Sequence, residues 1–466
     1  MSQSGHSIVI FSNCQGEAIQ AALRSLLVGT DIPVHLVASY HEFTETQAQQ
    51  LTECTVLLEQ VQRTERCPID TYVKPGTPRF RFPVMYTMAM WPFSQAGRGG
   101  EPDDRPKLFD VPINDDQIKA LMEKGGDMDA VIDEYEALDY TKLTDLHGTM
   151  ERNRAMIRDL ETRADIALWE GVEKRLSSAP TFHCFYHPYA PVMYPAAKAA
   201  CEFAIAAVGG ATGAVEGMLS RWLFGDAFDL HQVPIHPSVA RAFGLNWVKP
   251  DTRYRLRYQG ALTFREFWRA YLTNDVDDTI ERAALLAEDR NAPCLAMLDA
   301  TPGNSPDRDV IRARALLYCD RTQEAKALAA DVLDRNDPRV YRRMALDTWL
   351  RAAADRRDPG DCARAAQVLA EHPDDSAVQY FGGFLLRHAG QPERGGEALL
   401  RAAKLCPGDV IYAHNAGLVQ DGLGLKAEAI LSFNRAVQYA PPETRASLAE
   451  FARTFAANNS PSPATA

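Results

Sequence analysis

Short apolar runs alternate with longer amphipathic stretches through the first part of the chain. Five of these runs predict short buried strands: residues 8–11, 34–37, 55–58, 82–86 and 181–185. Helical spacing lies between several of them, as in Ile19, Ala22, Leu23 and Leu26 at i, i+3, i+4 and i+7. This alternation predicts an α/β domain with a mostly parallel sheet over residues 1–272.

Two segments interrupt this alternation. Residues 95–107 contain the sequence GRGGEPDDRP and predict a loop. Residues 115–176 are mainly helical in pattern and charged. We interpret them as a helical insertion or a cap over the sheet.

The remainder of the chain has a different pattern, because strand signals end near residue 275 and helical periodicity continues throughout. Five positions recur at an offset of 34 residues: Asp375, Gly383, Gly390, Ala402 and Pro407 return as Asp409, Gly417, Gly424, Ala436 and Pro441. This period resembles the tetratricopeptide repeat and predicts an all-α solenoid over residues 275–456, with a concave face for a protein partner. Residues 457–466 predict a disordered tail.

Composition narrows the classes of function. A net charge of −12 disfavours a broad nucleic-acid surface. The longest weakly polar stretch, residues 196–219, carries Lys198, Glu202 and Glu216, so we expect no membrane span. Nine cysteines are scattered without a CxxC pair, and we expect no signal peptide before the first strand, so the reducing cytoplasm is the expected compartment.

The first candidate for chemistry is Cys14, where the first strand gives way to a helix. A helix N-terminus favours an anion and lowers the pKa of a thiol toward the reactive thiolate. The alternative is a small buried hydrophobic residue. Ser12, Asn13 and Gln15 would be unusual core residues, and Asn13 and Gln15 offer amide donors for the oxyanion of an acyl transfer.

The second candidate is the step from His187 to Pro188, which follows the run at residues 181–185. Since the ends of parallel strands meet at one edge, His187 is a candidate general base there. The alternative is a histidine that caps a turn, which is the commoner role for such a residue taken alone. Gln60, after the third strand, is a further donor or a solvated loop amide. His183, Cys184 and His187 together suggest a metal site, but no further ligand lies at useful spacing, so we expect no metal.

Basic side chains that would meet phosphate groups include Arg79 and Arg81 before the fourth strand and Arg154 and Arg158 on one helix face. The alternative for the second pair is a solvated helix face. The chain has no GxxxxGK[ST] loop, no GxGxxG after a strand and no GxSxG elbow.

In their order and spacing these motifs resemble the WcbI-like capsular polysaccharide biosynthesis family. The resemblance spans about residues 5–272 and rests on Asn13-Cys14-Gln15, Gln60, His187-Pro188, VPIHP at residues 233–237 and GLNW at residues 244–247. It implies an α/β domain distantly like the SGNH hydrolases that binds coenzyme A and O-acetylates sugars of a bacterial surface polysaccharide.

Carried over by position, Cys14 stands where SGNH enzymes have their serine, and His187-Pro188 where they have their histidine. Two positions depart from that pattern. Cys184 replaces the expected aspartate, which leaves the third member of a triad unassigned, and Phe185-Tyr186 stand where relatives would carry an asparagine. Coenzyme A would be held at the sheet edge by six residues: Ser12, Arg79, Arg81, Arg154, Arg158 and Pro188.

The resemblance thus implies an acyltransferase that moves an acyl group from acetyl-CoA or another acyl-CoA to a glycan hydroxyl. His187 would act as the base, with Asn13, Gln15 and Gln60 as oxyanion or orienting donors. Cys14 would either carry the acyl group or line the thiol end of the cofactor pocket. Two alternatives stay open: an SGNH-like esterase, or a catalytically inactive scaffold that works through its solenoid.

Overall fold

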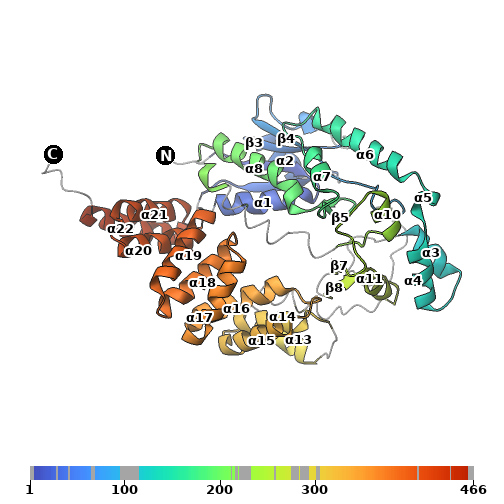
Figure 1. The fold of residues 1–466 in the computed structure, drawn as a ribbon. Coiled ribbons are helices and arrows are strands. Elements are labelled where there is room, and N and C mark those ends of the chain that lie inside the picture. The colour runs from blue at the N-terminus through green and yellow to red at the C-terminus, as the bar shows by residue number, and fades with distance from the viewer. Residues whose placement is uncertain are drawn as a thin grey trace.

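A four-stranded parallel sheet organises the N-terminal half (Figure 1), in the order β2-β1-β3-β4. The strands are β1 (Ile8–Ser12), β2 (Val34–Ala38), β3 (Val56–Val61) and β4 (Arg79–Pro83). The structure is a computed structural model that describes residues 5–27, 30–39, 42–63, 69–94, 115–210, 212–215, 219, 232–256, 259–273, 283, 293–300, 305–406, 409–440 and 442–459. The predicted loop at residues 95–107 lies outside these residues.

Helices cover both faces of the sheet because side chains alternate along each strand. Ile8 and Ile10 share a hydrophobic core with α1 (Gln15–Leu26) and α8 (Ala190–Ala207). The opposite face, with Val9 and Phe11, packs against Leu51 of α2 (Glu45–Glu53). The predicted α/β class is therefore confirmed.

Three of the five predicted strands differ from the sequence pattern. The third extends from the predicted residues 55–58 to Val61, so Gln60 lies within the strand and not after it. The fourth begins at Arg79 and ends at Pro83, because Arg79 and Arg81 alternate with the buried Phe80 and Phe82 in the period-two pattern of a half-buried strand. The fifth, β5 (Phe182–Cys184), pairs antiparallel with β6 (His187–Pro188) and lies outside the parallel sheet.

Helices and a second hairpin follow the sheet. The helical prediction for residues 115–176 is confirmed, while its role as a cap stays a prediction. The remaining elements of this half are α3 (Asp116–Glu123), α4 (Met128–Ala137), α5 (Tyr140–Leu143), α6 (Leu146–Glu161), α7 (Trp169–Arg175), α10 (Pro237–Ala242), β7 (Arg253–Arg255), β8 (Ala261–Thr263), α11 (Phe264–Thr273), and the short 3₁₀ helices η1 (Ile69–Thr71) and η2 (Thr212–Ala214).

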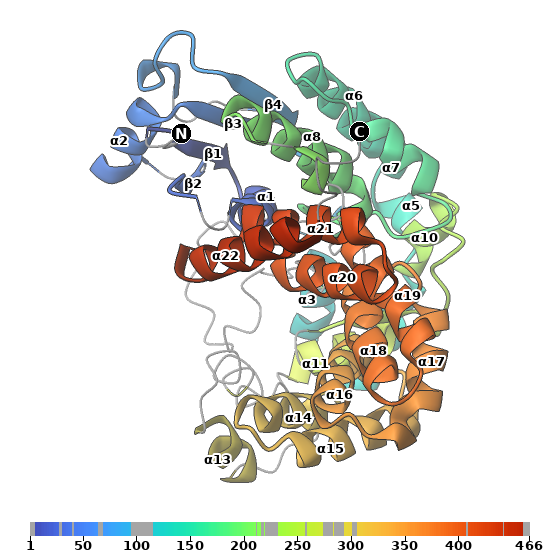
Figure 2. The same ribbon diagram turned by 90° about the vertical axis from the view of Figure 1, so that its left-hand side faces the viewer.

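The C-terminal half is helical and packs in a solenoid-like manner (Figure 2). Its helices are α13 (Pro293–Ala300), α14 (Arg308–Tyr318), α15 (Thr322–Arg335), α16 (Arg342–Arg356), η4 (Pro359–Asp361), α17 (Cys362–Glu371), α18 (Ser376–His388), α19 (Pro392–Leu405), α20 (Val410–Gly422), α21 (Lys426–Tyr439) and α22 (Pro442–Asn459). The prediction of a tail from residue 457 is wrong at its start, since α22 continues to Asn459.

The 34-residue period has a direct structural basis. Asp375 and Asp409 are the N-caps of α18 and α20, and each carboxylate accepts two backbone N–H groups of its helix. A Cβ atom on Gly383 would lie 2.8 Å from Ala398 Cβ, and one on Gly417 would lie 2.5 Å from the Phe433 ring. Glycine is thus needed where each pair of helices makes its closest approach. The assignment to the tetratricopeptide family stays a prediction, and Pro407 and Pro441 lie outside the described residues.

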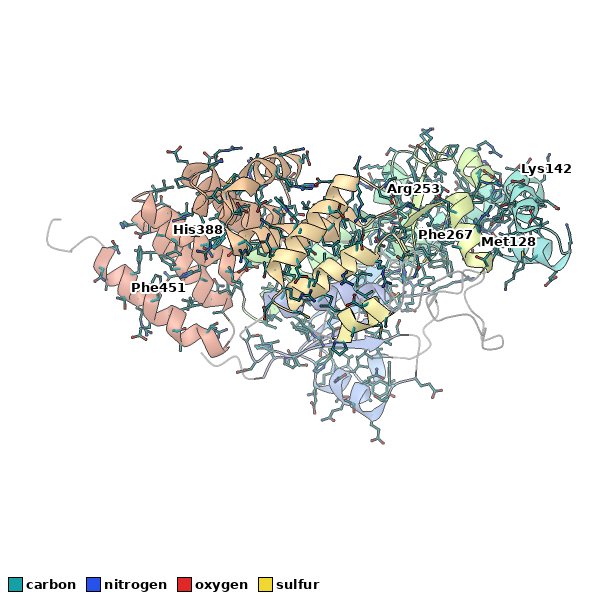
Figure 3. The ribbon with its side chains drawn as sticks, turned by 90° about the horizontal axis from the view of Figure 1, so that it is seen from below. Met128, Lys142, Arg253, Phe267, His388 and Phe451 are labelled. Carbon is teal, nitrogen blue, oxygen red and sulfur yellow. The ribbon has the colours of Figure 1, made fainter. Side chains whose placement is uncertain are left out.

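Among the residues that the structure describes, the solenoid contacts the α/β half at two places. At one, Arg255 of β7 forms a buried ion pair of 2.8 Å with Asp307, which also accepts the N–H groups of Gly260 and Tyr341. At the other, Ala402 and Tyr412 belong to the same hydrophobic core as the sheet. In the view from below, His388 and Phe451 of the solenoid lie at one end of the molecule and Met128 and Lys142 at the other (Figure 3). No helix in the described part of the chain has the length and apolarity to cross a membrane.

The close approach at Gly417 gives a test of the repeat packing. We expect Gly417→Ala to lower the free energy of unfolding by about 1–3 kcal/mol, because the added methyl collides with the buried Phe433 ring. Gly422→Ala, in the same helix, is the control: its Cβ meets nothing within 4 Å, so stability stays equal or rises. Urea denaturation measures both, and equal stabilities for the two variants would contradict this packing.

Candidate functional site

Polar side chains from distant parts of the chain meet at the carboxyl edge of the parallel sheet. Cys14 lies between the end of β1 and the first residue of α1. Gln60 lies near the end of β3, and Tyr86 follows β4. The β5–β6 hairpin adds His187 to this edge, although the hairpin itself is not part of the sheet.

The thiol of Cys14 and the imidazole of His187 are in direct contact. Cys14 Sγ lies 3.2 Å from His187 Nε2, across 173 residues of sequence, and both side chains are half-buried. The structure therefore brings together the two residues that the sequence proposed as nucleophile and base. A thiol and an imidazole at this distance can exchange a proton directly.

The side chain of Gln15 forms hydrogen bonds with three other segments that meet at this edge of the sheet. Its Nε2 donates to Met85 O at 2.6 Å and to Tyr186 O at 2.9 Å, while its Oε1 accepts the N–H of Met85 at 3.1 Å. Gln60 Nε2 donates to the same oxygen at 2.9 Å. Since both amide hydrogens are already bonded, the prediction of Gln15 as an oxyanion donor does not fit, and its role is positional.

Of the three predicted amide donors, Asn13 has the most exposed carboxamide, since Gln15 and Gln60 are each 1% exposed. Gln60 is 1% exposed, and its Oε1 accepts the backbone N–H of Asn13 at 3.1 Å, so Gln60 orients the loop. Asn13 Oδ1 accepts the N–H of Gln15 at 2.9 Å. Within the described residues, Asn13 Nδ2 has no hydrogen-bond partner, and the half-buried side chain leaves it open to a substrate.

The acidity of Cys14 differs from the sequence expectation. Burial, reinforced by the charges of Glu17 and Cys184, raises the pKa of the Cys14 thiol to about 12. Backbone N–H groups of Cys14 and Gln15 act in the opposite direction but do not offset the loss of water. The expected lowering by the helix N-terminus is therefore wrong, and the thiol is neutral near pH 7.

Cys184 occupies the place where an aspartate was expected. It is buried, and burial raises its pKa to about 11, while hydrogen bonds from the backbone of Tyr186 and His187 lower that pKa. Its sulfur thus helps to fix the turn that carries His187. It does not supply the negative charge that an aspartate would place beside the histidine.

The predicted phosphate-binding arginines of β4 are already paired. Arg79 bonds Asp70 at 2.7 Å and Glu59 at 3.2 Å, and Arg81 bonds Glu59 at 3.0 Å. Side chains alternate along a strand, so Glu59 faces away from the side where Gln60 meets Gln15. The prediction that Arg79 and Arg81 hold a cofactor beside Cys14 does not fit this geometry.

The other predicted cofactor residues are also engaged elsewhere. Arg154 and Arg158 share a helix face as expected, but both bond Glu173 of α7. Ser12 is fully buried against Gly16, where an added Cβ would lie 2.6 Å from Ser12 Cβ. Pro188 is buried within β6. Tight packing and ion pairing thus remove these four residues from the predicted role.

Sequence reasoning missed Arg63, which lies two residues beyond the end of β3. Its guanidinium is close to the Tyr86 hydroxyl, whose pKa is raised by burial and lowered by Arg63. Arg63 is exposed, so it offers a positive charge at the same edge as Cys14. A basic residue shortly after a parallel strand was the signal that would have found it.

The pKa of Cys14 predicts how the thiol reacts. A raised pKa keeps the thiol protonated through neutral and mildly alkaline pH, so very little of it is ionised at pH 8. We expect its alkylation by iodoacetamide, followed by mass spectrometry of the Cys14 peptide, to quicken about ten-fold per pH unit from pH 7 to 10. A rate that levels off below pH 9 would show instead that the thiolate is stabilised in the folded protein.

Comparison with known proteins adds the family. The search of curated proteins found no match. One similar solved structure is that of WcbI, described as a novel polysaccharide biosynthesis enzyme, in its native form without a disulfide bond between coenzyme A and its own Cys14. The two chains share 13% sequence identity with a TM-score of 0.41, and the match covers 70% of this chain and 99% of that one. The family model "Polysaccharide biosynthesis enzyme WcbI" matches residues 7–204. The chain therefore carries, over residues 7–204, a domain of the WcbI polysaccharide biosynthesis enzyme family.

Proposed function

We propose that the α/β domain is an acyltransferase that moves an acyl group, as in O-acetylation, from an acyl-CoA to a hydroxyl of a surface glycan or its precursor. The family, a polysaccharide biosynthesis enzyme, supports a glycan as the acceptor. The contact of 3.2 Å between Cys14 Sγ and His187 Nε2 carries the proposal, because acyl transfer from a thioester needs a nucleophile and a base in reach of each other.

The neutral thiol defines what His187 must do. As the Cys14 sulfur attacks the thioester carbonyl, its proton passes to His187 Nε2, and His187 gives that proton to the departing coenzyme thiolate. The acyl group then remains on Cys14 as a thioester. A glycan hydroxyl attacks it, His187 accepts the hydroxyl proton, and the same proton returns to the Cys14 thiolate as the ester leaves.

The other side chains at this edge fit the substrate. Asn13 directly precedes Cys14, and its half-buried amide would offer hydrogens to the oxyanion that forms during each attack. Arg63 supplies an exposed positive charge for an anionic part of the acyl-CoA. Gln15 and Gln60 act as positioning residues, because their own hydrogen bonds join Asn13, Met85 and Tyr186.

The solenoid is the part that we propose docks a protein partner. Large apolar side chains are exposed on its last helices and the turn between two of them: Ile411, Leu418, Leu423, Leu425, Leu431 and Phe451. We propose that the enzyme works in the cytoplasm, since a reducing compartment suits an enzyme that depends on a free Cys14.

Substitutions at the two contacting residues test the mechanism. We expect His187→Ala to lower kcat for acyl transfer to a polysaccharide acceptor by about 10²–10⁴-fold, because His187 is the base in both steps of the proposed mechanism. Cys14→Ser lowers it by about 10³-fold or more if Cys14 carries the acyl group. Quenched single-turnover reactions, read by intact-protein mass, show one added acyl group on the parent enzyme and none on the Cys14 variant.

Cys319→Ser is the matched control, since Cys319 is the other half-exposed free thiol among the described residues and lies in the solenoid. Its activity should equal that of the parent. Retention of most activity by Cys14→Ser would contradict covalent transfer, and Cys14 would then line the pocket for the coenzyme thiol. Equal ester hydrolysis with and without a glycan acceptor would instead favour an esterase.

A further inference from the structure

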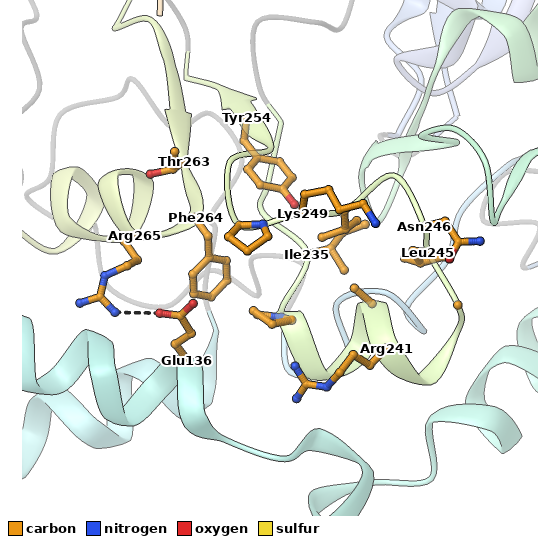
Figure 4. A pocket seen from close by; sticks show the side chains of 15 residues that line it. Glu136, Ile235, Arg241, Leu245, Asn246, Lys249, Tyr254, Thr263, Phe264 and Arg265 are labelled. Carbon is orange, nitrogen blue, oxygen red and sulfur yellow. Dashed lines mark hydrogen bonds and ion pairs between the residues drawn. The ribbon is translucent and has the colours of Figure 1, made fainter. Parts of the chain in front are cut away.

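A pocket of about 550 Å³ lies outside the Cys14 site, and all of its lining residues except Glu136 lie beyond the matched family segment (Figure 4). Its walls come from the segment around α10, the following loop at residues 244–250, the β7–β8 hairpin and the start of α11. This size is in the range of pockets that hold small organic ligands. None of the residues to which we assign a role in acyl transfer lines this pocket.

The floor of the pocket is apolar. Ile235, Leu245 and Phe264 line it, and each is less than 8% exposed. The ring of Tyr254 lies against the same hollow (Figure 4). A buried floor of aliphatic and aromatic groups favours a flat, weakly polar body such as a nucleobase.

The rim of the pocket carries two uncompensated positive charges. Arg265 is neutralised by Glu136 at 2.7 Å and by Asp133 (Figure 4). By contrast, the side chains of Arg241 and Lys249 are exposed and, within the ranges that the structure describes, form no ion pair or hydrogen bond. Two free cations beside one hollow, in a chain of net charge −12, point to a ligand with at least two negative charges.

The walls are held in place by the protein itself. Leu245 N–H donates to Ala240 O at 2.9 Å, and the Trp247 indole donates to Leu176 O at 3.1 Å. The N–H of Lys249 donates to Thr252 Oγ1 at 2.7 Å. Since the loop is already bonded at its beginning, middle and end, a ligand would bind without the cost of ordering it.

The same segment connects the pocket to the Cys14 edge. Val233 N–H donates to His183 O of β5 at 2.8 Å, and the Trp91 indole donates to Pro234 O at 3.2 Å. Ile235, the next residue, is on the pocket floor. The pocket is thus built on the chain that packs against the hairpin of His187.

From these features we propose that the pocket binds a nucleoside diphosphate group, with the base on the apolar floor and the phosphates at Arg241 and Lys249. Two sources share this chemistry: the nucleotide end of coenzyme A and a nucleotide-activated sugar. The choice between these sources rests on the proposed function, whereas nucleotide binding itself does not.

Calorimetric titration of the full chain tests the proposal with ADP, UDP and inorganic pyrophosphate as probes. We expect the nucleotides to bind more tightly than pyrophosphate, because the base adds contact with the floor. Arg241→Ala combined with Lys249→Ala should weaken nucleotide binding about 100-fold or more, since both charged contacts to phosphate are lost. Arg401→Ala with Lys404→Ala, two exposed cations of α19, is the matched control and should leave binding unchanged.

Each other result overturns part or all of the assignment. Equal affinity for pyrophosphate and nucleotides would show that the nucleobase makes no favourable contact with the apolar floor. No binding of any probe, or equal binding by the pocket variant, would overturn the site, as would preference for an acidic oligosaccharide such as a trimer of galacturonate. An effect of the pocket variant on coenzyme A binding identifies the coenzyme as the source, and an effect on UDP-glucose binding alone identifies the sugar nucleotide.

The two proposals fail separately. Nucleotide binding that persists in Cys14→Ser and His187→Ala, with no acyl transfer by the parent enzyme, would overturn the proposed function and leave the pocket standing. Acyl transfer that depends on Cys14 and His187, with nucleotide affinity equal in the pocket variant and the parent, would overturn the pocket and leave the function.

Discussion

The carboxamide of Gln15 is the interaction on which the geometry of the site depends. From the first turn of α1 it bonds Gln60 of β3, both backbone groups of Met85 after β4, and the carbonyl of Tyr186 in the β5–β6 hairpin. Four segments that are far apart in sequence are thereby held at one point. Because Gln15 is 1% exposed, any bond lost here would leave a buried polar group without water, and this cost makes the arrangement specific.

That rigid frame matters because the chemistry at its centre is a proton transfer. Burial keeps Cys14 as a neutral thiol, so the site in its resting state holds a proton between sulfur and imidazole rather than a free thiolate. A neutral thiol is a poor nucleophile and is protected from unspecific alkylation and oxidation. Reactivity then depends on His187, and the backbone of His187 is held by the turn that Cys184 stabilises.

The attachment of the solenoid follows a similar logic. Asp307 is almost fully buried, and burial raises its pKa even though Arg255 acts to lower it. When the cost of burying the carboxylate exceeds its attraction to the arginine, the ion pair adds little net stability, but removing one partner would leave the other charge buried and unpaired. Its carboxylate also binds Gly260 and Tyr341, so it fixes how the β7–β8 hairpin meets the first solenoid helices. The ion pair therefore determines how the hairpin and the solenoid helices are oriented more than it adds to the stability of their interface.

The sequence by itself determined the local features: the change from strand to helix at Cys14, the α/β alternation, and the 34-residue period at whose repeated positions the structure has aspartate caps and glycine contacts. These follow from propensity and periodicity over a few turns of chain. It also named Cys14 and His187, but their contact, the raised thiol pKa, the pairing of Arg79 with Glu59 and the two free cations at Arg241 and Lys249 were decided by the tertiary structure alone. Burial and ion pairing depend on which distant segments surround a group, and no local pattern records those neighbours.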